Sequence, residues 1–525
     1  MFDPESFPWL KSKGYLHITP KINVLKEHRL LIEKVTNAKF VARYAFFPLI
    51  HSSIRERRYR RDHRRPPKRF HTKKLPTGEI IRNAKSRPLH YATHLDSLIF
   101  GYYSHLLYIR YEEELSKSKP LAESVIAYRK IKIPGEIKNK GTIHFAHEVF
   151  KKIKENTEHG PVCVLKFDIE SFFSRMDHQK LLSQWILLFP ENGKLPVDHF
   201  NVYKATTKFS YILKDDLRFA RNRKEGGKRP GFDEKKLAQI RNETGRQSFF
   251  LSTKEFRESV KDRSLPIYKY PFRAKDGKIC GIPQGLPISS VLANIYLLDF
   301  DREMIALHEQ FNTFYRRYSD DIILICSPAD AETVKKVVNK GIEKCRLTLS
   351  GEKTEQFIFE NISLAGERPD IISYKITDQG EPIRGIPLAY LGFEFFGNRI
   401  AVKSANLSKF YRRMILTVKR KCKRAKKVSE NNPGSLPMLF FRKIYKLYTL
   451  QNLSRYAYRN KNIVLKENLN QGYTMNSAVY QPKFRTNYLT YIGRAAQIMG
   501  EESIKEQLSK HQKILKKAVA KHLFK

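Results

Sequence analysis

The stretch "FYRRYSDDIILIC", residues 314–326, places two adjacent aspartates, Asp320 and Asp321, between two runs of strand-forming residues. Ser and Asp are favoured in turns, so "SDD" predicts a tight connection between two strands. Two carboxylates held side by side repel each other, and each raises the pKa of the other. Taken alone, the pair is typical of an ordinary hairpin turn. A chemical role requires a third group.

That third group is Asp168, which ends another predicted strand. Residues 162–168, "VCVLKFD", form a continuous apolar run of the kind that a buried strand carries. If this strand lies beside the hairpin, three carboxylates converge at one end of a small sheet. Two Mg²⁺ ions about 3.5 to 4 Å apart, held by such carboxylates, activate a 3′ hydroxyl and stabilise a leaving pyrophosphate. The pattern therefore predicts a site for two Mg²⁺ ions, with Mn²⁺ as an alternative.

The composition indicates a polyanionic partner. The 525 residues include 99 Lys and Arg against 53 Asp and Glu, a formal charge of +46. Such an excess favours nucleic acid, through counterion release and long-range attraction. A membrane surface is the weaker alternative, because no apolar run approaches about eighteen residues. We therefore expect a nucleic-acid partner and no membrane.

The N-terminus and the cysteines favour a cytoplasmic protein. "MFDPESFPWLKSKGY" has acidic residues and prolines where a secretory signal has a basic start and an apolar stretch. The five cysteines are scattered and include no CxxC pair, so neither a disulfide framework nor a zinc site is indicated.

One basic stretch stands out, "RERRYRRDHRRPPKRFHTKK", residues 55–74. A solvated charged surface is the ordinary interpretation of such a run. Here Tyr59 and Phe70 are interleaved with the arginines, which favours contact with phosphates and bases. The nucleic-acid-binding residues that we predict are Arg57, Arg58, Arg60, Arg61, Arg64, Arg65, Lys73 and Lys74.

Periodicity predicts the remaining elements. Helical spacing covers 23–44, 93–115 and 141–156, and residues 75–92 resemble a hairpin with a Pro and Gly turn. Residues after about 403 are expected to be helical. The domains that we predict are 1–54, an N-terminal helical extension; 55–160, fingers; 161–402, a palm with an elaboration at 195–280; and 403–525, a helical thumb and C-terminal region.

Five motifs together resemble the reverse transcriptases. They are "FDIESFF", "GIPQGLPISSVLANIYL", "YSDD", "LTLSGEKT" and "YLGFEF", in the order of that family and spread over roughly residues 70 to 410. One departure is Ser319, which stands where Ala or Met is more usual. The resemblance implies an α+β right-hand polymerase fold, with fingers, a ferredoxin-like antiparallel-sheet palm and a helical thumb.

The resemblance also implies roles at the metal site. Asp168 and Asp320 would hold both ions, and Asp321 would complete the cluster. Lys353 is similar to the lysine that protonates departing pyrophosphate, although an exposed lysine is the alternative. The implied metal-binding set is Asp168, Ile169, Asp320 and Asp321.

Further residues resemble the deoxynucleotide site of the family. Phe173 matches the steric gate that excludes a ribose 2′ hydroxyl, whereas Phe172 is expected in the core. Gln284 lies in "PQG", where glycine permits close backbone approach. Asn294 is either a family polar position or a satisfied helix amide. The implied substrate-binding set is Phe173, Gln284, Gly285, Tyr318, Arg82 and Arg87.

The implied activity is RNA-directed DNA synthesis from deoxynucleotides on an RNA template, with a DNA product. The segments "RPLHYATHLDSLIFGYYSHLL", "AYRK" and "NKGTIHFAHEVF" resemble defence-associated bacterial enzymes of the abortive-infection type, which implies a structured noncoding RNA partner and an anti-phage role. Template-independent or protein-primed DNA synthesis is one alternative, and a maturase-like RNA-binding factor is another. Whether the chain forms a homo-oligomer stays open.

Overall fold

The computed structural model divides the chain into two compact units. Unit 1 comprises residues 1–129, 165–324 and 329–354, and unit 2 comprises residues 130–164, 325–328 and 355–525. The residues that the structure describes are 6–57, 60–61, 69–70, 72–74, 80–82, 84–217, 221–222, 228–229, 239, 242–243, 248–250, 252–269, 271–274, 276–363, 370–432, 434–450, 465–468, 472–475 and 486–523.

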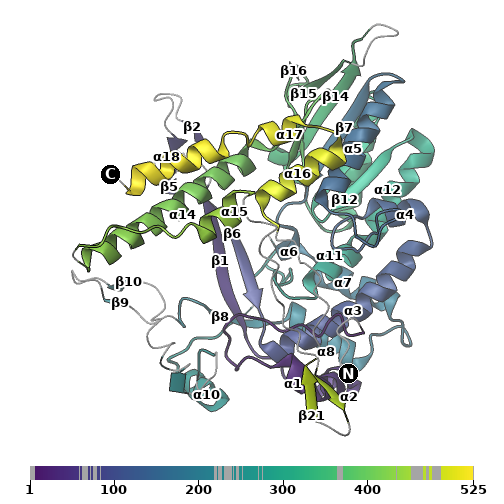
Figure 1. Ribbon diagram of the computed structural model, residues 1–525. Helices are drawn as coiled ribbons and strands as arrows, with labels where there is room; N and C mark the ends of the chain where they lie inside the picture. Colours follow the sequence, from purple (N-terminus) through teal and green to yellow (C-terminus); the bar gives the residue numbers. More distant parts are fainter. Residues whose placement is uncertain are drawn as a thin grey trace. The chain divides into compact units, whose positions relative to one another are not determined.

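A four-stranded sheet in unit 1 has the strand order β11-β8-β1-β6 (Figure 1). Its long strands β1 (Leu49–Arg57) and β6 (Ala84–Tyr91) pair antiparallel. β8 (Ser210–Leu213) runs parallel to β1, and β11 (Tyr268–Lys269) pairs antiparallel with β8. β8 and β11, which belong to the predicted elaboration at 195–280, therefore join the same sheet as β1.

The elaboration at 195–280 also supplies part of a hydrophobic core. Phe249, Phe256 and Leu265 are buried in one cluster with Ile50 of β1 and Ile212 of β8. Burial of such large apolar side chains stabilises the fold by about 1.5 to 3 kcal/mol each. The segment is thus an integral part of unit 1 rather than a peripheral insertion.

The hairpin predicted at 75–92 is confirmed in part, because strands on either side of its Pro and Gly residues pair, but residues 84–91 belong to another pairing. β5 (Ile80–Arg82) pairs with β4 (Thr72–Lys74), whereas β6 pairs with β1, which lies far from it in sequence. Tertiary pairing with a long strand offers β6 eight partnered residues, which a short local hairpin cannot match. Four further short strands of unit 1 form two pairs: β2 (Arg60–Arg61) with β3 (Arg69–Phe70), and β9 (Arg221–Asn222) with β10 (Lys228–Arg229).

Helices build the rest of unit 1, and the predicted helices at 23–44 and 93–115 are confirmed. The long helix α3 (His94–Ser116) begins at Thr93, whose hydroxyl accepts a hydrogen bond from the Asp96 amide at 3.3 Å. The other helices are α1 (Val24–Thr36), α2 (Ala38–Arg43), α4 (Lys119–Ser124), α6 (Phe172–Arg175), α7 (His178–Leu188), α8 (Val197–Thr207), α10 (Thr253–Lys261), α11 (Ser289–Tyr296), α12 (Leu298–Phe311) and α13 (Ala331–Lys344).

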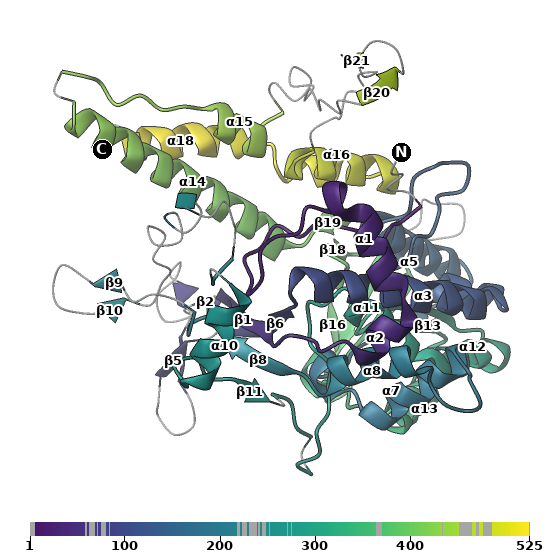
Figure 2. The same cartoon turned by 90° about the horizontal axis from the view of Figure 1, so that it is seen from below.

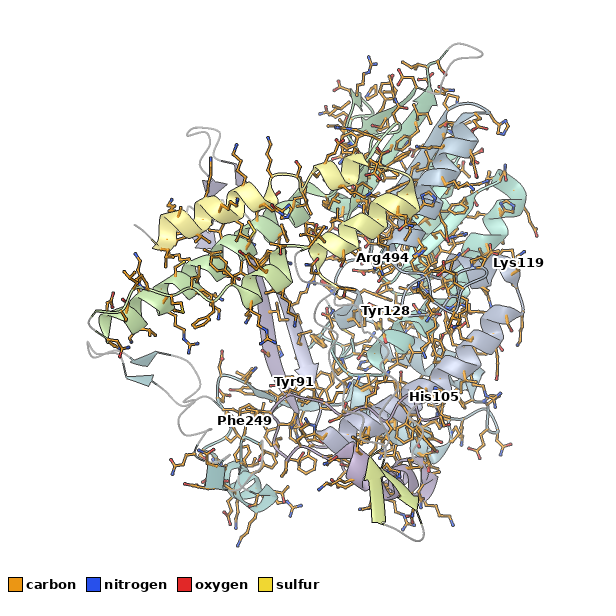
Figure 3. The ribbon with its side chains drawn as sticks, in the orientation of Figure 1. Tyr91, His105, Lys119, Tyr128, Phe249 and Arg494 are labelled. Carbon is orange, nitrogen blue, oxygen red and sulfur yellow. The ribbon has the colours of Figure 1, made fainter. Side chains whose placement is uncertain are left out.

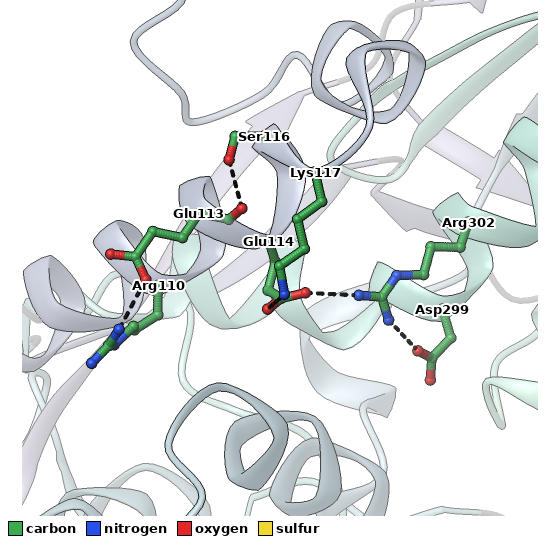
Figure 4. Close-up of polar contacts among 7 residues, drawn as sticks. All are labelled: Arg110, Glu113, Glu114, Ser116, Lys117, Asp299 and Arg302. Atoms are coloured by element: carbon green, nitrogen blue, oxygen red, sulfur yellow. Dashed lines mark hydrogen bonds and ion pairs between the residues drawn. The ribbon is translucent and has the colours of Figure 1, made fainter.

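Ion pairs link the end of α3 to α12 on the surface of unit 1 (Figure 4). Arg302 donates to Glu114 at 3.1 Å and to Asp299 at 3.4 Å, while Lys117 also pairs with Glu114. Exposed pairs of this kind contribute about 0 to 1 kcal/mol each. They orient two helix ends more than they stabilise the fold.

Three neighbouring strands carry the predicted carboxylates. The strand order is β12-β13-β7, formed by β12 (Phe314–Tyr318), β13 (Asp321–Cys326) and β7 (Val162–Asp168). The hairpin prediction for 314–326 is confirmed, because β12 and β13 flank Ser319 and Asp320 directly. β13 is buried at every position after Asp321, which a fully covered strand requires.

Unit 2 combines two small sheets with helices. One sheet has the strand order β14-β15-β16 and the other β17-β18-β19. A stack of buried aromatic rings crosses the interior, with Phe395 4.8 Å from Phe150 and 5.2 Å from Phe359 between ring centroids. The strands are β14 (Glu355–Asn361), β15 (Ile371–Ile376), β16 (Pro382–Arg384), β17 (Leu388–Tyr390), β18 (Phe393–Phe395) and β19 (Ile400–Val402).

The C-terminal part of unit 2 is mostly helical, as predicted. Helices α14 and α18 lie side by side in both ribbon views (Figures 1 and 2). One hairpin, β20 (Leu465–Asn468) with β21 (Gly472–Met475), departs from the all-helical prediction for residues after 403. The helices of unit 2 are α5 (Thr142–Thr157), α14 (Ser404–Glu430), α15 (Arg442–Tyr448), α16 (Tyr488–Met499), α17 (Ser503–Glu506) and α18 (His511–Leu523).

The described helices include none with the length and hydropathy needed to cross a membrane. The predicted domain limits at 54, 160 and 402 stay predictions, because the two compact units follow a different criterion, the density of contacts along the chain.

Candidate active site

Backbone hydrogen bonds bring the end of β7 to the SDD turn. The Ile169 amide donates to the Asp320 carbonyl at 3.2 Å, and the Ser350 amide donates to the Asp168 carbonyl at 2.8 Å. Asp168 therefore lies between the hairpin and the loop before Lys353. The two strand ends that carry the predicted carboxylates are neighbours, which is the condition that a shared site imposes.

The electrostatics of the site are those of crowded carboxylates. Burial, then the adjacent Asp320 charge and to a smaller extent Asp168, raise the pKa of Asp321 from 3.8 to about 6. The cations of Lys166 and Lys353 act in the opposite direction on the same pKa. A negative charge on Asp321 is thus disfavoured unless positive charge is close.

Lys353 supplies part of that positive charge. It ends the short 3₁₀ helix η1 (Gly351–Lys353), and its ammonium group donates to Oδ2 of Asp168. The lysine side chain is half exposed, whereas that of Asp168 is only 15% exposed. An amine at the mouth of the site can reach both a carboxylate and a phosphate. Its general-acid role stays a prediction.

The donor chemistry of the site suits hard divalent cations. Carboxylate and carbonyl oxygens are the ligands that Mg²⁺ and Mn²⁺ prefer. Within the described residues, no group of three or more His, Cys, Asp or Glu side chains has the spacing of a metal centre. The pKa of Asp321 is raised, and the Lys353 ammonium group lies beside Asp168. Both observations indicate that positive charge is favoured at these carboxylates. The residues fit the implied ions by chemistry, and their metal-binding role stays a prediction.

Behind the turn, Arg317 is fully buried. Its guanidinium donates to Asp301 of α12 through Nε at 2.7 Å and through Nη2 at 2.6 Å, and both side chains are 0% exposed. Nη1 donates to the Ser319 carbonyl at 3.2 Å. A bidentate pair of this kind is strong and directional. The backbone of the SDD turn is therefore attached to a charged group in the core.

The Arg317–Asp301 pair sits in a polar network without water contact. The Tyr315 hydroxyl donates to Oδ1 of Asp301 at 2.6 Å, and burial beside Asp301 raises the pKa of Tyr315 well above its ordinary value. Arg317 Nη1 also lies 3.4 Å from Oδ1 of Asn294 in α11. Asp301 keeps the pKa of Arg317 raised despite burial. Each member is satisfied by another, as buried polar groups must be.

The turn before α11 pairs with the segment that carries Phe173. The Ile282 amide donates to the Phe173 carbonyl at 2.7 Å. Gly281 has φ +76°, and a Cβ there would lie 2.5 Å from the Ser174 carbonyl oxygen, so only glycine fits. The Phe172 side chain is buried, whereas that of Phe173 is partly exposed. Phe172 is thus a core residue as predicted, and the gate role of Phe173 stays a prediction.

Gln284 and Gly285 are held against the end of β6. The His90 amide donates to the Gln284 carbonyl at 2.8 Å. Gly285 has φ +116°, and a Cβ there would lie 2.7 Å from the His90 carbonyl oxygen. His90 is itself buried, 3.0 Å from the His51 ring nitrogen, and burial lowers its pKa to about 3. A neutral histidine pair therefore supports the loop that presents Gln284.

The other predicted substrate and nucleic-acid residues are distributed along unit 1. Tyr318 ends β12 and is half buried, and burial together with the nearby Tyr128 raises its pKa. Arg87 is exposed in β6. Arg58, Arg64 and Arg65 lie outside the described residues. Six more have described backbones, but their side chains lie outside the described part: Arg57, Arg60, Arg61, Lys73, Lys74 and Arg82.

Sequence reasoning missed Arg317, Asp301 and Tyr128. A signal for Arg317 was present, because alternation in "FYRRY" places residues 315 and 317 on one face of β12, and that face is buried. A buried arginine requires a carboxylate partner. The sequence does not say that the partner is in α12. Asn294 is a satisfied helix amide, since it donates to the Ala127 carbonyl at 2.9 Å.

Comparison with known families identifies part of the chain. Residues 265–395 match the family model described as "Reverse transcriptase (RNA-dependent DNA polymerase)". This segment carries Gln284, the SDD turn and Lys353, whereas Asp168 and Phe173 precede it. The matched segment is thus similar to the reverse transcriptases, which are RNA-directed DNA polymerases and belong to the nucleotidyltransferases. Enzymes with this domain generally use divalent metal ions.

Solved telomerase structures are similar at a lower level. Apo telomerase from Candida tropicalis, truncated from its C-terminal domain, is 12% identical with a TM-score of 0.35, and the match covers 62% of this chain and 53% of that one. Telomerase from Candida albicans in complex with a TWJ fragment of telomeric RNA is 9% identical with a TM-score of 0.34, covering 85% and 60% respectively. The chain therefore spans less than two thirds of either telomerase. No curated protein matches it.

The buried pair yields a stability prediction. Arg317→Met leaves the Asp301 carboxylate buried without its cation, so we expect a loss of about 3 to 5 kcal/mol in the free energy of unfolding. Adding Asp301→Asn removes the stranded charge and should restore part of this loss. Urea unfolding of both variants is the measurement. A double variant no more stable than Arg317→Met would contradict the role of the ion pair.

The crowded carboxylates yield a second prediction. The pKa of Asp321 is higher in the folded state, about 6, than in the unfolded chain, about 3.9. Its contribution to stability is therefore present below pH 4 and lost as pH rises through 6. Asp321→Asn should raise the free energy of unfolding at pH 8 in EDTA by roughly 1 to 3 kcal/mol.

This gain should shrink as the pH approaches 4, and thermal melting across that range is the measurement. Mg²⁺ should then stabilise the wild type more than the variant, since ions that bind only the folded state raise its melting temperature. A variant less stable than the wild type at pH 8 in EDTA would show that the crowding does not strain the site.

Proposed function

We propose that this chain is a reverse transcriptase that adds deoxynucleotides to a DNA 3′ end on an RNA template. The observation that carries the proposal is the junction of β7 with the SDD turn, where the Ile169 amide bonds to the Asp320 carbonyl. This junction joins a carboxylate outside the matched family segment to the pair inside it. On this proposal the three side chains would serve as the acidic residues that a polymerase of this class needs.

Asp168, Asp320 and Asp321, with the backbone of Ile169, would hold two divalent ions. When bound, such ions activate the attacking hydroxyl and neutralise charge on the leaving pyrophosphate. Lys353 stands at the mouth of the site, where it would hold a proton near the phosphates. Arg317 holds the SDD turn from its buried side and so keeps the direction of the carboxylates. Arg317 itself would not touch substrate.

The deoxynucleotide would lie between the carboxylates and the loop at 281–285. Phe173 would exclude a ribose 2′ hydroxyl, since its side chain is partly exposed and its carbonyl accepts a hydrogen bond from the Ile282 amide of this loop. Gln284 and the close backbone approach at Gly285 would contact the sugar and the base pair. Tyr318, Arg82 and Arg87 would complete the substrate site, with the arginines on the triphosphate.

Substitution of the paired aspartates tests the activity. Asp320→Asn with Asp321→Asn should reduce deoxynucleotide incorporation on an RNA template and DNA primer by at least about a thousandfold, because the ion ligands are lost. RNA affinity should stay within about twofold, since basic residues supply it. Primer extension and filter binding measure the two quantities.

Asp378→Asn, in an exposed turn of unit 2, is a control that makes the same kind of substitution at a carboxylate away from the site. Incorporation by the paired Asn variant at the control's rate would overturn the proposal. Ribonucleotide incorporation by the wild type at the rate for deoxynucleotides would contradict the role of Phe173.

The partner and biological role extend the same proposal. The charge of +46 supports a large polyanionic partner, and we propose a structured noncoding RNA as template, within a bacterial anti-phage system. This part rests on the resemblance of residues 87–107, 127–130 and 139–150 to defence-associated enzymes. Template-independent or protein-primed synthesis is the alternative within the polymerase class.

Purification from native cells tests this part. We expect one discrete RNA to copurify and the DNA product to be its complement. A homopolymeric or random product would favour template-independent synthesis, and DNA attached covalently to the chain would favour protein priming. A spliced intron RNA as the copurifying species would favour the maturase-like alternative instead.

A further inference from the structure

A short segment outside the strands runs along β12 and ends at the SDD turn. Val125 forms a bridge with Arg317, and the Ile126 amide donates to the Arg317 carbonyl at 3.0 Å. Asn294 fixes the next residue, because its amide donates to the Ala127 carbonyl at 2.9 Å. The backbone that leads to Tyr128 is therefore attached to the same core that holds Arg317.

Arg129 fixes the other side of Tyr128. Its guanidinium donates to Glu112 of α3 through Nε at 2.8 Å and through Nη2 at 2.6 Å. Nη1 donates back to the Val125 carbonyl at 2.7 Å and to the Ala122 carbonyl. This bonding closes the segment into a compact loop. Tyr128 has anchored residues on both sides.

Tyr128 itself adopts a backbone conformation that tyrosine rarely takes. Its φ is +62°, in the left-handed region, and its side chain is 48% exposed. A half-exposed ring in a strained backbone gains little from packing, so packing does not explain the conformation. Figure 3 labels this residue.

The hydroxyl of Tyr128 donates to Oγ of Ser319 at 3.2 Å. Ser319 is the central residue of the catalytic turn, and it also has a left-handed φ, +62°. Arg317 holds the Ser319 carbonyl at 3.2 Å from the buried side. The turn residue between Tyr318 and Asp320 is thus held at two points, one in the core and one at the surface.

We propose that Tyr128 is a positioning residue, which holds the catalytic turn through the Ser319 hydroxyl and so fixes the direction of Asp320 and Asp321. The inference rests on the proposed polymerase function and adds to it a residue outside the five motifs that resemble the reverse transcriptases. It also accounts for a departure from the family. Ala or Met, the more usual residues at this position, cannot accept this hydrogen bond.

A double-mutant cycle tests the pairing. The variants are Tyr128→Phe, Ser319→Ala and the two together, each removing one hydroxyl and nothing else. Loss of one such hydrogen bond should lower kcat for deoxynucleotide incorporation roughly threefold to tenfold, with KM for the template and primer and the melting temperature unchanged. The double variant should be no slower than the slower single variant.

Hydrogen exchange gives a second readout that needs no catalysis. In Tyr128→Phe, amides in the segment 314–326 should exchange faster, because the turn opens locally more often. The same substitution in the Ser319→Ala background should add no further increase. This measurement reports the hydrogen bond even if the chain has no polymerase activity, so failure of the proposed function and failure of this inference remain separate.

Two outcomes would overturn the inference. One is a Tyr128→Phe variant with wild-type kcat and wild-type exchange in 314–326. The other is an equal loss of kcat from Tyr128→Phe in both backgrounds, because the hydroxyl would then act on a group other than Ser319. A melting temperature that falls in parallel with kcat would indicate a structural role instead.

Discussion

Repulsion among carboxylates is the constraint on which the site depends. Asp168, Asp320 and Asp321 come from two neighbouring strand ends, and burial together with repulsion from the other two carboxylates raises the pKa of Asp321. Side chains under such repulsion turn away from one another unless the backbone holds them. The hydrogen bond from the Ile169 amide to the Asp320 carbonyl and the left-handed Ser319 provide that restraint.

The position of the SDD turn also depends on a buried ion pair. Arg317 and Asp301 are both fully buried, and apolar residues of similar volume often replace such a pair without loss of stability. The pair is therefore better explained by the orientation that it gives to the SDD turn than by a gain in the stability of the fold. Only a planar donor can bind Asp301 with one edge and still donate to the Ser319 carbonyl, so a lysine at 317 would not substitute.

Sequence patterns predicted the elements whose structure depends on residues close together in the chain. The hairpin at 314–326, the strand ending in Asp168 and the glycine turn before α11 follow from alternation, apolar runs and turn residues. The hairpin predicted at 75–92 was right about a strand pair beside the Pro and Gly residues but wrong in its limits, because β6 pairs with β1, a choice that no local pattern reveals. The all-helical prediction after residue 403 missed β20 and β21 for the related reason that a short strand pair has weak periodicity.

The partners of the SDD turn were missed for a different reason. Tyr128 and Ser319 are separated by 191 residues, and each looks ordinary alone, one as a tyrosine in "AYRK" and the other as a small turn residue. The two residues must be interpreted together, because the Ser319 hydroxyl gains a role only when a hydrogen-bond donor reaches it. A substitution in the motif "YSDD" is therefore interpretable only together with the segment 125–129, which lies outside the five reverse transcriptase motifs. The departure from the family pattern at Ser319 is best explained together with Tyr128, the residue that contacts it.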